Sequence, residues 1–328
     1  MTILITGVAG LLGSRFAQWL LDNTGHKVVG IDNLSGGYSE YIPKGVDFNN
    51  FDCINQNNIG WVFRHYKPAI VYHFAAYAAE GLSPFIRMFN YENNLVATAN
   101  IVNQCIKHKV DRLVFTSSMA VYGNGKSPFD ESDSMAPIDP YGIAKMGCEM
   151  DIKIAGEQHG LDWCIVRPHN VFGPGQNIWD RYRNVLGIWM RQCIRGENIT
   201  VFGDGEQIRA FTYIDNILRP LYLAGTSAKA SNEIINLGGI NYSTILMAAK
   251  IVAEVANAEA LIELLGGRHE VRLAYSTYRK SVDILEYRED VSFEDGIEKM
   301  WKWARNQPAR KVKDMPYEIE DKLYKFWE

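Results

Sequence analysis

The chain has 328 residues, of which 47% are hydrophobic and 22% charged, values ordinary for a globular protein with a large core. A net charge of −4 gives no electrostatic case for binding nucleic acid or an anionic membrane, and no stretch approaches the roughly 20 apolar residues of a membrane span. The five cysteines form no paired motif and the seven histidines form no cluster. We therefore expect reduced thiols, a cytoplasmic location and no metal site.

The N-terminus carries the strongest local pattern. Residues 2–6 are a β-branched, apolar run that predicts a strand buried on both faces. Gly7, Gly10 and Gly13 follow, and from Leu11 the apolar residues recur at helical spacing. A strand that leads through a glycine turn into a helix directs free backbone N–H groups towards one point, which suits a pyrophosphate. We expect a dinucleotide site here, with a purely structural glycine turn as the alternative.

A second apolar run, residues 27–31, predicts the next strand and ends at Asp32. Asp32 follows Gly13 at about the 20-residue separation at which a carboxylate reaches the ribose hydroxyls of adenosine. The same carboxylate would repel a 2′-phosphate. The predicted cofactor is therefore NAD and not NADP.

The next segments continue the alternation of strands and helices. Further strands are expected at residues 46–51, 69–73, 111–116 and 163–166, with helices around residue 60 and from Pro84 to Lys107. This alternation predicts an α/β protein with a Rossmann-type, doubly wound parallel sheet. Ligands of such sheets bind beyond the carboxyl ends of the strands.

Beyond about residue 175 the alternation fades. Helices are expected near residues 182–195, 215–225, 243–257, 292–306 and 317–326. The prediction is an NAD-binding domain at residues 1–175, to which some later segments return, and a smaller mixed α/β substrate lobe with C-terminal helices at residues 176–328. A short basic patch, residues 310–313, is interpreted as a solvated connector.

Tyr141 and Lys145 lie one turn apart on a helix that is expected to begin at Pro140. The reference pKa of tyrosine, about 10, is too high for a base at neutral pH. A neighbouring ammonium and the positive nicotinamide of NAD would lower that pKa, so that Tyr141 removes a hydroxyl proton while Ser118 hydrogen-bonds the same substrate oxygen. The alternative is an ordinary surface pair, because i,i+4 spacings occur in most helices.

Several motifs occur in a fixed order along the chain: Gly7-x-x-Gly10-x-x-Gly13, Ser117-Ser118-x-x-Val121-Tyr122-Gly123, Tyr141-x-x-x-Lys145, Arg167-Pro168-His169-Asn170 and Gly203-Asp204-Gly205-x-Gln207-x-Arg209. With these motifs the chain resembles the extended short-chain dehydrogenase/reductases. Within them it is similar to the nucleotide-sugar 4-epimerases typified by UDP-glucose 4-epimerase.

The resemblance implies roles for individual residues. The catalytic residues would be Ser118, Tyr141 and Lys145. The NAD-binding residues would be Gly7, Gly10, Leu11, Leu12, Gly13, Asp32, Asn33, Leu34, Ser35, Gly36, Gly37, Asp52, Cys53, Phe74, Ala75, Ala76, Asn94, Thr116, Tyr141, Lys145 and His169. The substrate, most simply a UDP-sugar, would contact Ser118, Tyr141, Asn170, Asn184, Arg209 and Arg268. The resemblance also implies a homodimer formed through the helices near residues 84–107 and 140–158.

Met119 and Ala120 indicate which branch of the family the chain resembles, because the related 4,6-dehydratases carry an Asp-Glu pair at these positions. Without a second acid/base pair, the expected chemistry is oxidation at C4, rotation of the 4-keto sugar and return of hydride to its other face. The sugar would be a UDP-hexose, a UDP-N-acetylhexosamine or a UDP-uronate, and Ala274 would leave room for an N-acetyl group at C2. The alternatives are another nucleotide-sugar oxidoreductase or dehydratase, and a non-catalytic NAD-binding sensor or scaffold.

Overall fold

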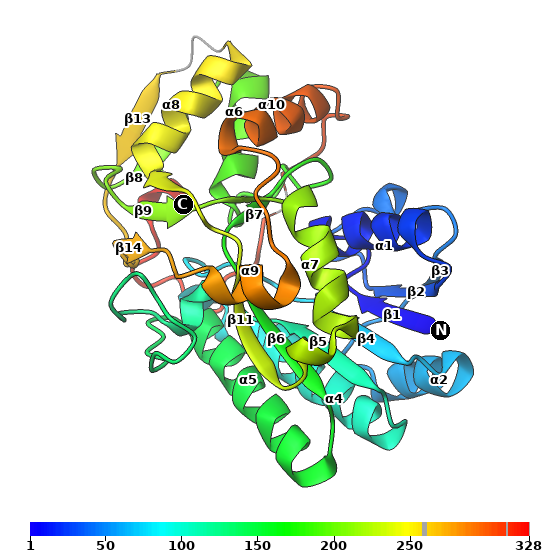
Figure 1. The fold of residues 1–328 in the computed structure, drawn as a ribbon. Helices are drawn as coiled ribbons and strands as arrows, with labels where there is room; N and C mark the ends of the chain where they lie inside the picture. Colours follow the sequence, from blue (N-terminus) through cyan, green and yellow to red (C-terminus); the bar gives the residue numbers. More distant parts are fainter. Residues whose placement is uncertain (258–260, 313, 328) are drawn as a thin grey trace.

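The structure, a computed structural model, describes residues 1–257, 261–312 and 314–327. The largest sheet within these residues is built from β1 (Thr2–Thr6), β2 (Lys27–Asp32), β3 (Asp47–Asn50), β4 (Ile70–His73), β5 (Arg112–Thr116), β6 (Trp163–Pro168) and β11 (Glu233–Leu237). All pairings are parallel, in the order β11-β6-β5-β4-β1-β2-β3 (Figure 1). The order reverses between β1 and β4, which is where such sheets bind their ligands. The predicted doubly wound parallel sheet is confirmed.

Helices cover both faces of this sheet. One face carries α1 (Leu11–Asn23) and α7 (Asp215–Thr226), and the other carries α2 (Gln56–Tyr66), α4 (Ala97–Lys107) and α5 (Pro140–His159). Alternate residues of β1 point to opposite faces: Ile3 and Ile5 pack with α1 and α7, whereas Leu4 packs with the other three helices. Because both faces are covered, the strand is apolar throughout instead of alternating.

The helix predicted from Pro84 to Lys107 is interrupted, which corrects the prediction. It consists of a 3-10 turn (Ser83–Phe85), α3 (Arg87–Tyr91), a π-helical turn (Glu92–Val96) and α4. In the π turn the Asn94 amide donates to the Asn90 carbonyl at 2.9 Å and to the Tyr77 carbonyl at 3.3 Å. A polar side chain that fastens the helix to a loop competes with the regular helical ladder, and apolar spacing does not reveal it.

Helix α9 (Arg279–Leu285) packs beside α7 and β11, and the other elements form a smaller mixed α/β region beyond the carboxyl ends of the strands (Figure 1). This region contains β7 (Val171–Phe172), α6 (Val185–Arg195), β8 (Ile199–Phe202), β9 (Ile208–Ala210), β10 (Thr212–Tyr213), β12 (Tyr242–Thr244), α8 (Ile245–Ala256), β13 (Ile262–Leu265), β14 (Leu273–Ala274) and α10 (Phe293–Ala304). Strand β13 pairs with β8, β10 pairs with β7, and β9 lies between β12 and β14. Helices α6, α7, α8 and α10 confirm four of the five helices predicted after residue 175.

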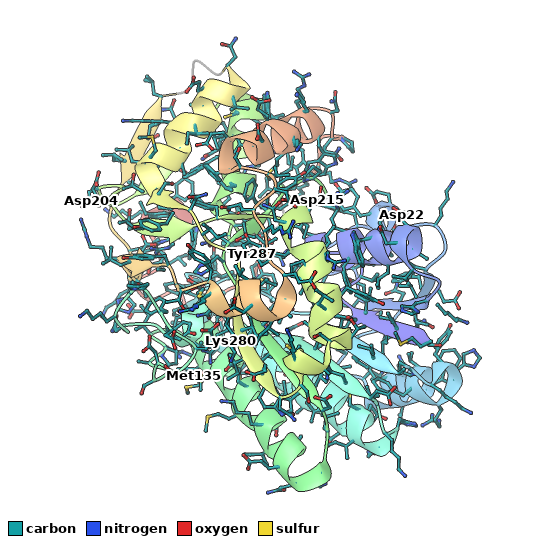
Figure 2. All side chains as sticks on the ribbon, viewed as in Figure 1. Asp22, Met135, Asp204, Asp215, Lys280 and Tyr287 are labelled. Atoms are coloured by element: carbon teal, nitrogen blue, oxygen red, sulfur yellow. The ribbon has the colours of Figure 1, made fainter. Side chains whose placement is uncertain are left out.

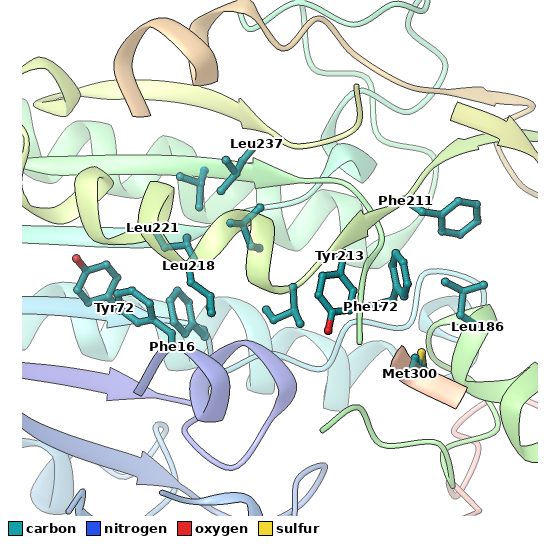
Figure 3. Close-up of a cluster of buried hydrophobic side chains, with 14 of the residues drawn as sticks. Phe16, Tyr72, Phe172, Leu186, Phe211, Tyr213, Leu218, Leu221, Leu237 and Met300 are labelled. Atoms are coloured by element: carbon teal, nitrogen blue, oxygen red, sulfur yellow. The ribbon is translucent and has the colours of Figure 1, made fainter. Parts of the chain in front are cut away.

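One hydrophobic cluster joins the central sheet to this smaller region (Figure 3). At the sheet end, the rings of Phe16 and Tyr72 lie with centroids 4.5 Å apart. Leu218 of α7 continues the cluster towards Phe172, and Met300 of α10 belongs to its far end. Burying each such side chain contributes about 1.5–3 kcal/mol. Because this core crosses residue 175, the division into residues 1–175 and 176–328 stays a prediction.

The chain after α10 packs on the segment that follows β4 and lacks the predicted helix at residues 317–326, so that prediction is wrong. Only a 3-10 turn, Lys325–Trp327, is helical there. Trp327 is buried against Phe85 and Tyr182, with ring centroids 6.2 and 5.3 Å away. The position of this segment is fixed by single aromatic side chains that pack into a pocket, and not by the apolar face of a helix.

The basic patch at residues 310–313 is only partly the solvated connector that the sequence predicts. The Arg310 guanidinium pairs with Glu40 and lies over the ring of Tyr38, 3.9 Å from its centroid. Lys313 lies outside the described residues. Elsewhere, charged side chains such as those of Asp22 and Asp204 project from the periphery (Figure 2). None of the described helices is long and apolar enough to cross a bilayer.

Candidate active site

A cleft of about 470 Å³ lies at the carboxyl ends of the central strands. The sequence-predicted residues that line it are Gly7, Gly10, Leu11, Leu12, Gly13, Asp32, Asn33, Ser35, Gly36, Gly37, Asp52, Cys53, Phe74, Ala75, Ala76, Thr116, Ser118, Tyr141, Lys145, Asn170, Asn184, Arg209 and Arg268. The fold thus gathers loops that are distant in sequence around one space. Leu34, Asn94 and His169 are not among the lining residues.

The glycine turn after β1 is packed too closely for any side chain. A Cβ on Gly13 would lie 2.1 Å from the Gly7 carbonyl oxygen, and a Cβ on Gly7 would lie 2.8 Å from the backbone nitrogen of Ala75. Gly10 precedes α1 without a side-chain cap, and the first residues of the helix line the cleft. Free N–H groups at a helix N-terminus, approached closely through glycines, form a site for a pyrophosphate.

Gly13→Ala is expected to lower the free energy of unfolding by about 1–3 kcal/mol and to weaken NAD binding, because the backbone around Gly7 must move to admit a methyl group. Denaturant unfolding and the NAD content of the purified protein measure the two effects. The matched control is Gly25→Ala, since a Cβ on Gly25 meets no atom within 4 Å. Equal behaviour of the two variants would mean that close packing at Gly13 does not shape the site.

Asp32 at the end of β2 is held by two backbone hydrogen bonds. Its carboxylate accepts from the Ala9 N–H at 3.0 Å and from the Leu34 N–H at 2.7 Å. Burial raises the pKa of this carboxyl, while the two N–H groups and the Arg183 guanidinium oppose the rise. A fixed acceptor at this point of the cleft suits a ribose with free hydroxyls and disfavours a 2′-phosphate.

Leu34, Asn94 and His169 are not among the residues that line the cleft, and their predicted contact with NAD stays a prediction. Leu34 adopts φ 59° in the turn after β2. The Asn94 side chain accepts from the Tyr77 N–H at 3.2 Å and so fixes the loop after β4. His169 is buried with its Nε2 2.7 Å from the Ser276 hydroxyl, and burial lowers its pKa to about 3.

Helix α5 begins where the sequence predicts. Pro140 occupies its first turn, and the Asp139 carboxylate caps it by accepting from the Gly142 N–H at 2.9 Å. The Tyr141 N–H donates to the Ser83 hydroxyl at 3.1 Å. These contacts fix the first turn of α5, and with it the direction of the side chain of Tyr141.

The three predicted catalytic residues meet in the cleft. The Lys145 ammonium donates to the Thr116 carbonyl at 2.8 Å and lies 5.9 Å from the centroid of the Tyr141 ring. The Tyr141 hydroxyl is hydrogen-bonded to Ser118, which follows β5. A phenol and an alcohol side by side can share one substrate hydroxyl, as general acid/base chemistry requires.

The pKa values differ from the sequence-based expectation. Burial raises the pKa of Tyr141, and the Glu80 carboxylate adds to the rise while the Ser118 hydrogen bond opposes it. Burial lowers the pKa of Lys145 to about 8. In the protein without NAD, the effect of burial therefore dominates and the phenol of Tyr141 is not acidic.

At the other end of the cleft lie residues predicted to hold the substrate. The guanidinium groups of Arg209 and Arg268 both pair with Glu270, each at 3.1 Å. Asn184 caps α6 by accepting from the Leu186 N–H at 3.3 Å, so the N-terminus of that helix also faces the cleft. Two guanidinium groups and a helix N-terminus together favour a diphosphate.

Ala274 does not line the cleft. It packs beside the buried cluster of Val121, Tyr122 and Phe129. The expectation that Ala274 makes room for an N-acetyl group stays a prediction.

Sequence reasoning missed a buried polar network behind the catalytic residues. Glu149 accepts from the Arg167 guanidinium at 2.6 and 2.9 Å and from the Ser117 hydroxyl at 2.5 Å. Arg167 also donates to the Tyr122 hydroxyl at 2.6 Å, and Tyr122 donates to Asn236 of β11 at 2.8 Å. Glu149 follows Lys145 by one further helical turn, and that spacing was the available signal.

Two further features of the cleft had no sequence signal. Glu80 on the loop after β4 lines it, and so do Phe326 and Trp327 from the C-terminal segment. Their participation depends on long-range folding.

The residues present fit NAD. The close-packed glycine turn brings the uncapped N-terminus of α1 to the cleft, Asp32 is a fixed acceptor, and Tyr141 and Lys145 line the same cleft. When bound, NAD supplies the hydride acceptor and the positive charge of its nicotinamide ring.

Comparison with known proteins identifies the family of this chain. The sequence matches the NAD dependent epimerase/dehydratase family over residues 3–238. It is 29% identical over 319 residues to the UDP-glucuronate 4-epimerase of Thermodesulfobacterium geofontis, covering 92% of this chain and 95% of that protein.

Solved structures agree. The UDP-glucose 4-epimerase of Thermotoga maritima matches with a TM-score of 0.88 at 30% identity, over 93% of this chain and 99% of that one. The UDP-N-acetylglucosamine 4-epimerase of Methanobrevibacter ruminantium matches with a TM-score of 0.85 at 28% identity, over 92% and 97%. The chain therefore belongs to the NAD-dependent epimerase/dehydratase family.

Proposed function

We propose that this protein inverts the configuration at C4 of a UDP-sugar with bound NAD as its hydride carrier. The observation that carries the proposal is the hydrogen-bonded pair of Tyr141 and Ser118, which lies in one cleft with the glycine turn and the pair of Arg209 and Arg268. The 4-epimerase names of the compared proteins support the same reaction.

Each side chain has one task in this proposal. Ser118 and Tyr141 hydrogen-bond the C4 hydroxyl, and Tyr141 takes its proton as C4 becomes a ketone. Arg209 and Arg268 hold the diphosphate, so the 4-keto hexose can turn while the nucleotide stays in place. Tyr141 then returns the proton as hydride is restored to the opposite face of C4.

The dehydratase alternative lacks its acid and base. Met119 and Ala120 form a 3-10 turn directly after Ser118, and neither side chain can exchange a proton. The sensor alternative leaves the buried Tyr141–Ser118 pair without a task.

Incubation with UDP-glucose, UDP-N-acetylglucosamine and UDP-glucuronate, followed by NMR of the products, tests the reaction. We expect the C4 epimer of at least one sugar and no accumulation of NADH. A product that has lost water, or stoichiometric formation of NADH, would replace the epimerase by a dehydratase or a one-way oxidoreductase.

We also propose that the protein forms a homodimer through α5 and the helical segment before α4. Ile143, Met150 and Ile154 form an apolar stripe along the exposed side of α5. Met88 of α3 and Val96 of the π turn are also exposed, 65% and 50%. Apolar stripes on helices usually mark a packing surface.

The double variant Met150→Glu/Ile154→Glu is expected to run as a monomer in light scattering, because both charges would be placed in the dimer interface. Leu264→Glu is the matched control, since Leu264 is an exposed apolar residue of β13 in the other region. A monomeric parent protein, or a double variant of unchanged mass, would contradict the interface.

A further inference from the structure

One carboxylate in the cleft has no part in the steps proposed above. Glu80 lies on the loop between β4 and the turn Ser83–Phe85, lines the cleft and is exposed to it. Its backbone carbonyl accepts from the Ser83 hydroxyl at 2.8 Å. Among the described residues, its carboxylate takes part in no hydrogen bond or ion pair.

The charged neighbours of Glu80 place it between the two halves of the cleft. On one side lies Tyr141, whose pKa it raises. On the other side lie Arg209 and Arg268, whose positive charges lower the pKa of Glu80 from beyond ion-pair distance. A Cβ on the next residue, Gly81, would lie 3.5 Å from Nη1 of Arg268.

The proposed function places the hexose in the same part of the cleft, between Tyr141 and the two arginines. Its C4 hydroxyl would meet Tyr141 and its diphosphate would meet Arg209 and Arg268, so the ring lies beside Glu80. An unpartnered carboxylate can accept hydrogen bonds from hydroxyl and amide groups of a neutral sugar. It repels a second carboxylate, and the repulsion grows as the sugar displaces water from the cleft.

We propose that Glu80 determines the hexose specificity: the protein accepts UDP-hexoses and UDP-N-acetylhexosamines and rejects UDP-uronates. The inference rests on the proposed function and narrows its range of sugar substrates.

The electrostatics of the site agree with this selection. Enclosure within the cleft raises the pKa of Glu80 to about 7, Asp139 and Glu270 add to the rise, and Arg209 and Arg268 oppose it. The pKa is raised even though two guanidinium groups lie nearby, so the site disfavours a negative charge. A uronate carboxylate beside Glu80 would add a second negative charge there.

The test measures dissociation constants of UDP-glucose and UDP-glucuronate by calorimetry, on NAD-loaded protein at pH 8, where Glu80 is ionised. The parent protein is expected to prefer UDP-glucose by about tenfold or more. Glu80→Gln keeps the shape, removes the charge and should abolish most of that preference. Glu80→Asp keeps the charge and should retain it.

Equal affinity of the parent protein for both sugars, or an unchanged preference in Glu80→Gln, would overturn the selection by Glu80. The NMR product assay separates this outcome from a failure of the proposed reaction. If the protein discriminates between the sugars but forms no C4 epimer, the specificity proposal is supported and the proposed epimerase reaction is contradicted. Binding of neither sugar would overturn both.

Discussion

Tyr141→Phe is expected to lower kcat about 10²–10⁴-fold while the protein keeps its fold and its bound NAD. The phenol is the only group in the proposal that exchanges a proton with the substrate, and general acid/base groups contribute rate factors of this size. The ring remains to pack in the cleft, so the change removes one oxygen atom and the hydrogen bond to Ser118.

The measurement is steady-state epimerisation together with the NAD content of the purified variant. Tyr287→Phe is the matched control, because Tyr287 (labelled in Figure 2) is also buried but does not line the cleft. Turnover by Tyr141→Phe at the rate of this control would remove Tyr141 from the mechanism. Loss of NAD from the variant would instead assign the phenol a role in holding the cofactor.

Glu149→Gln is expected to lower the free energy of unfolding by about 3–5 kcal/mol, the effect of leaving one member of a buried ion pair without its partner. The side chains of Glu149 and Arg167 are 0% and 2% exposed, so water cannot replace the lost charge. The same carboxylate accepts from Ser117, and its loss also loosens the end of β5 next to Ser118.

Denaturant unfolding monitored by circular dichroism measures this effect. Glu298→Gln on α10 is the control, because Glu298 is more than half exposed and lies 3.7 Å from Lys302 in a surface pair that is expected to contribute little. A Glu149→Gln variant as stable as this control would show that Arg167 finds another partner.

Features encoded within a few consecutive residues could be predicted from the sequence. The apolar run of β1, the glycines after it and the spacing of Tyr141 and Lys145 depend on local geometry, and the structure contains each of them. The doubly wound parallel sheet also followed, because alternating strands and helices leave few ways to wind a sheet.

Features that depend on contacts between distant segments could not be predicted. His169 belongs to a recognisable motif, yet its ring packs on Ser276 and not in the cleft. The C-terminal segment, with an expected helix, is placed by the burial of Trp327. The sequence around Glu80 resembles an ordinary loop, and only the fold places this residue in the cleft with Tyr141.

The late arrival of β11 in the central sheet has a consequence for synthesis on the ribosome. Strand β6 ends at Pro168, whereas β11 does not begin until Glu233. At about 5–20 residues per second, the nascent chain leaves the apolar border of β6 unpaired for roughly 3–13 s. During that interval the unpaired edge of β6 can pair with other chains and cause aggregation. Chaperones that shield nascent strands should therefore matter more for this protein than for one whose sheet is completed by consecutive segments.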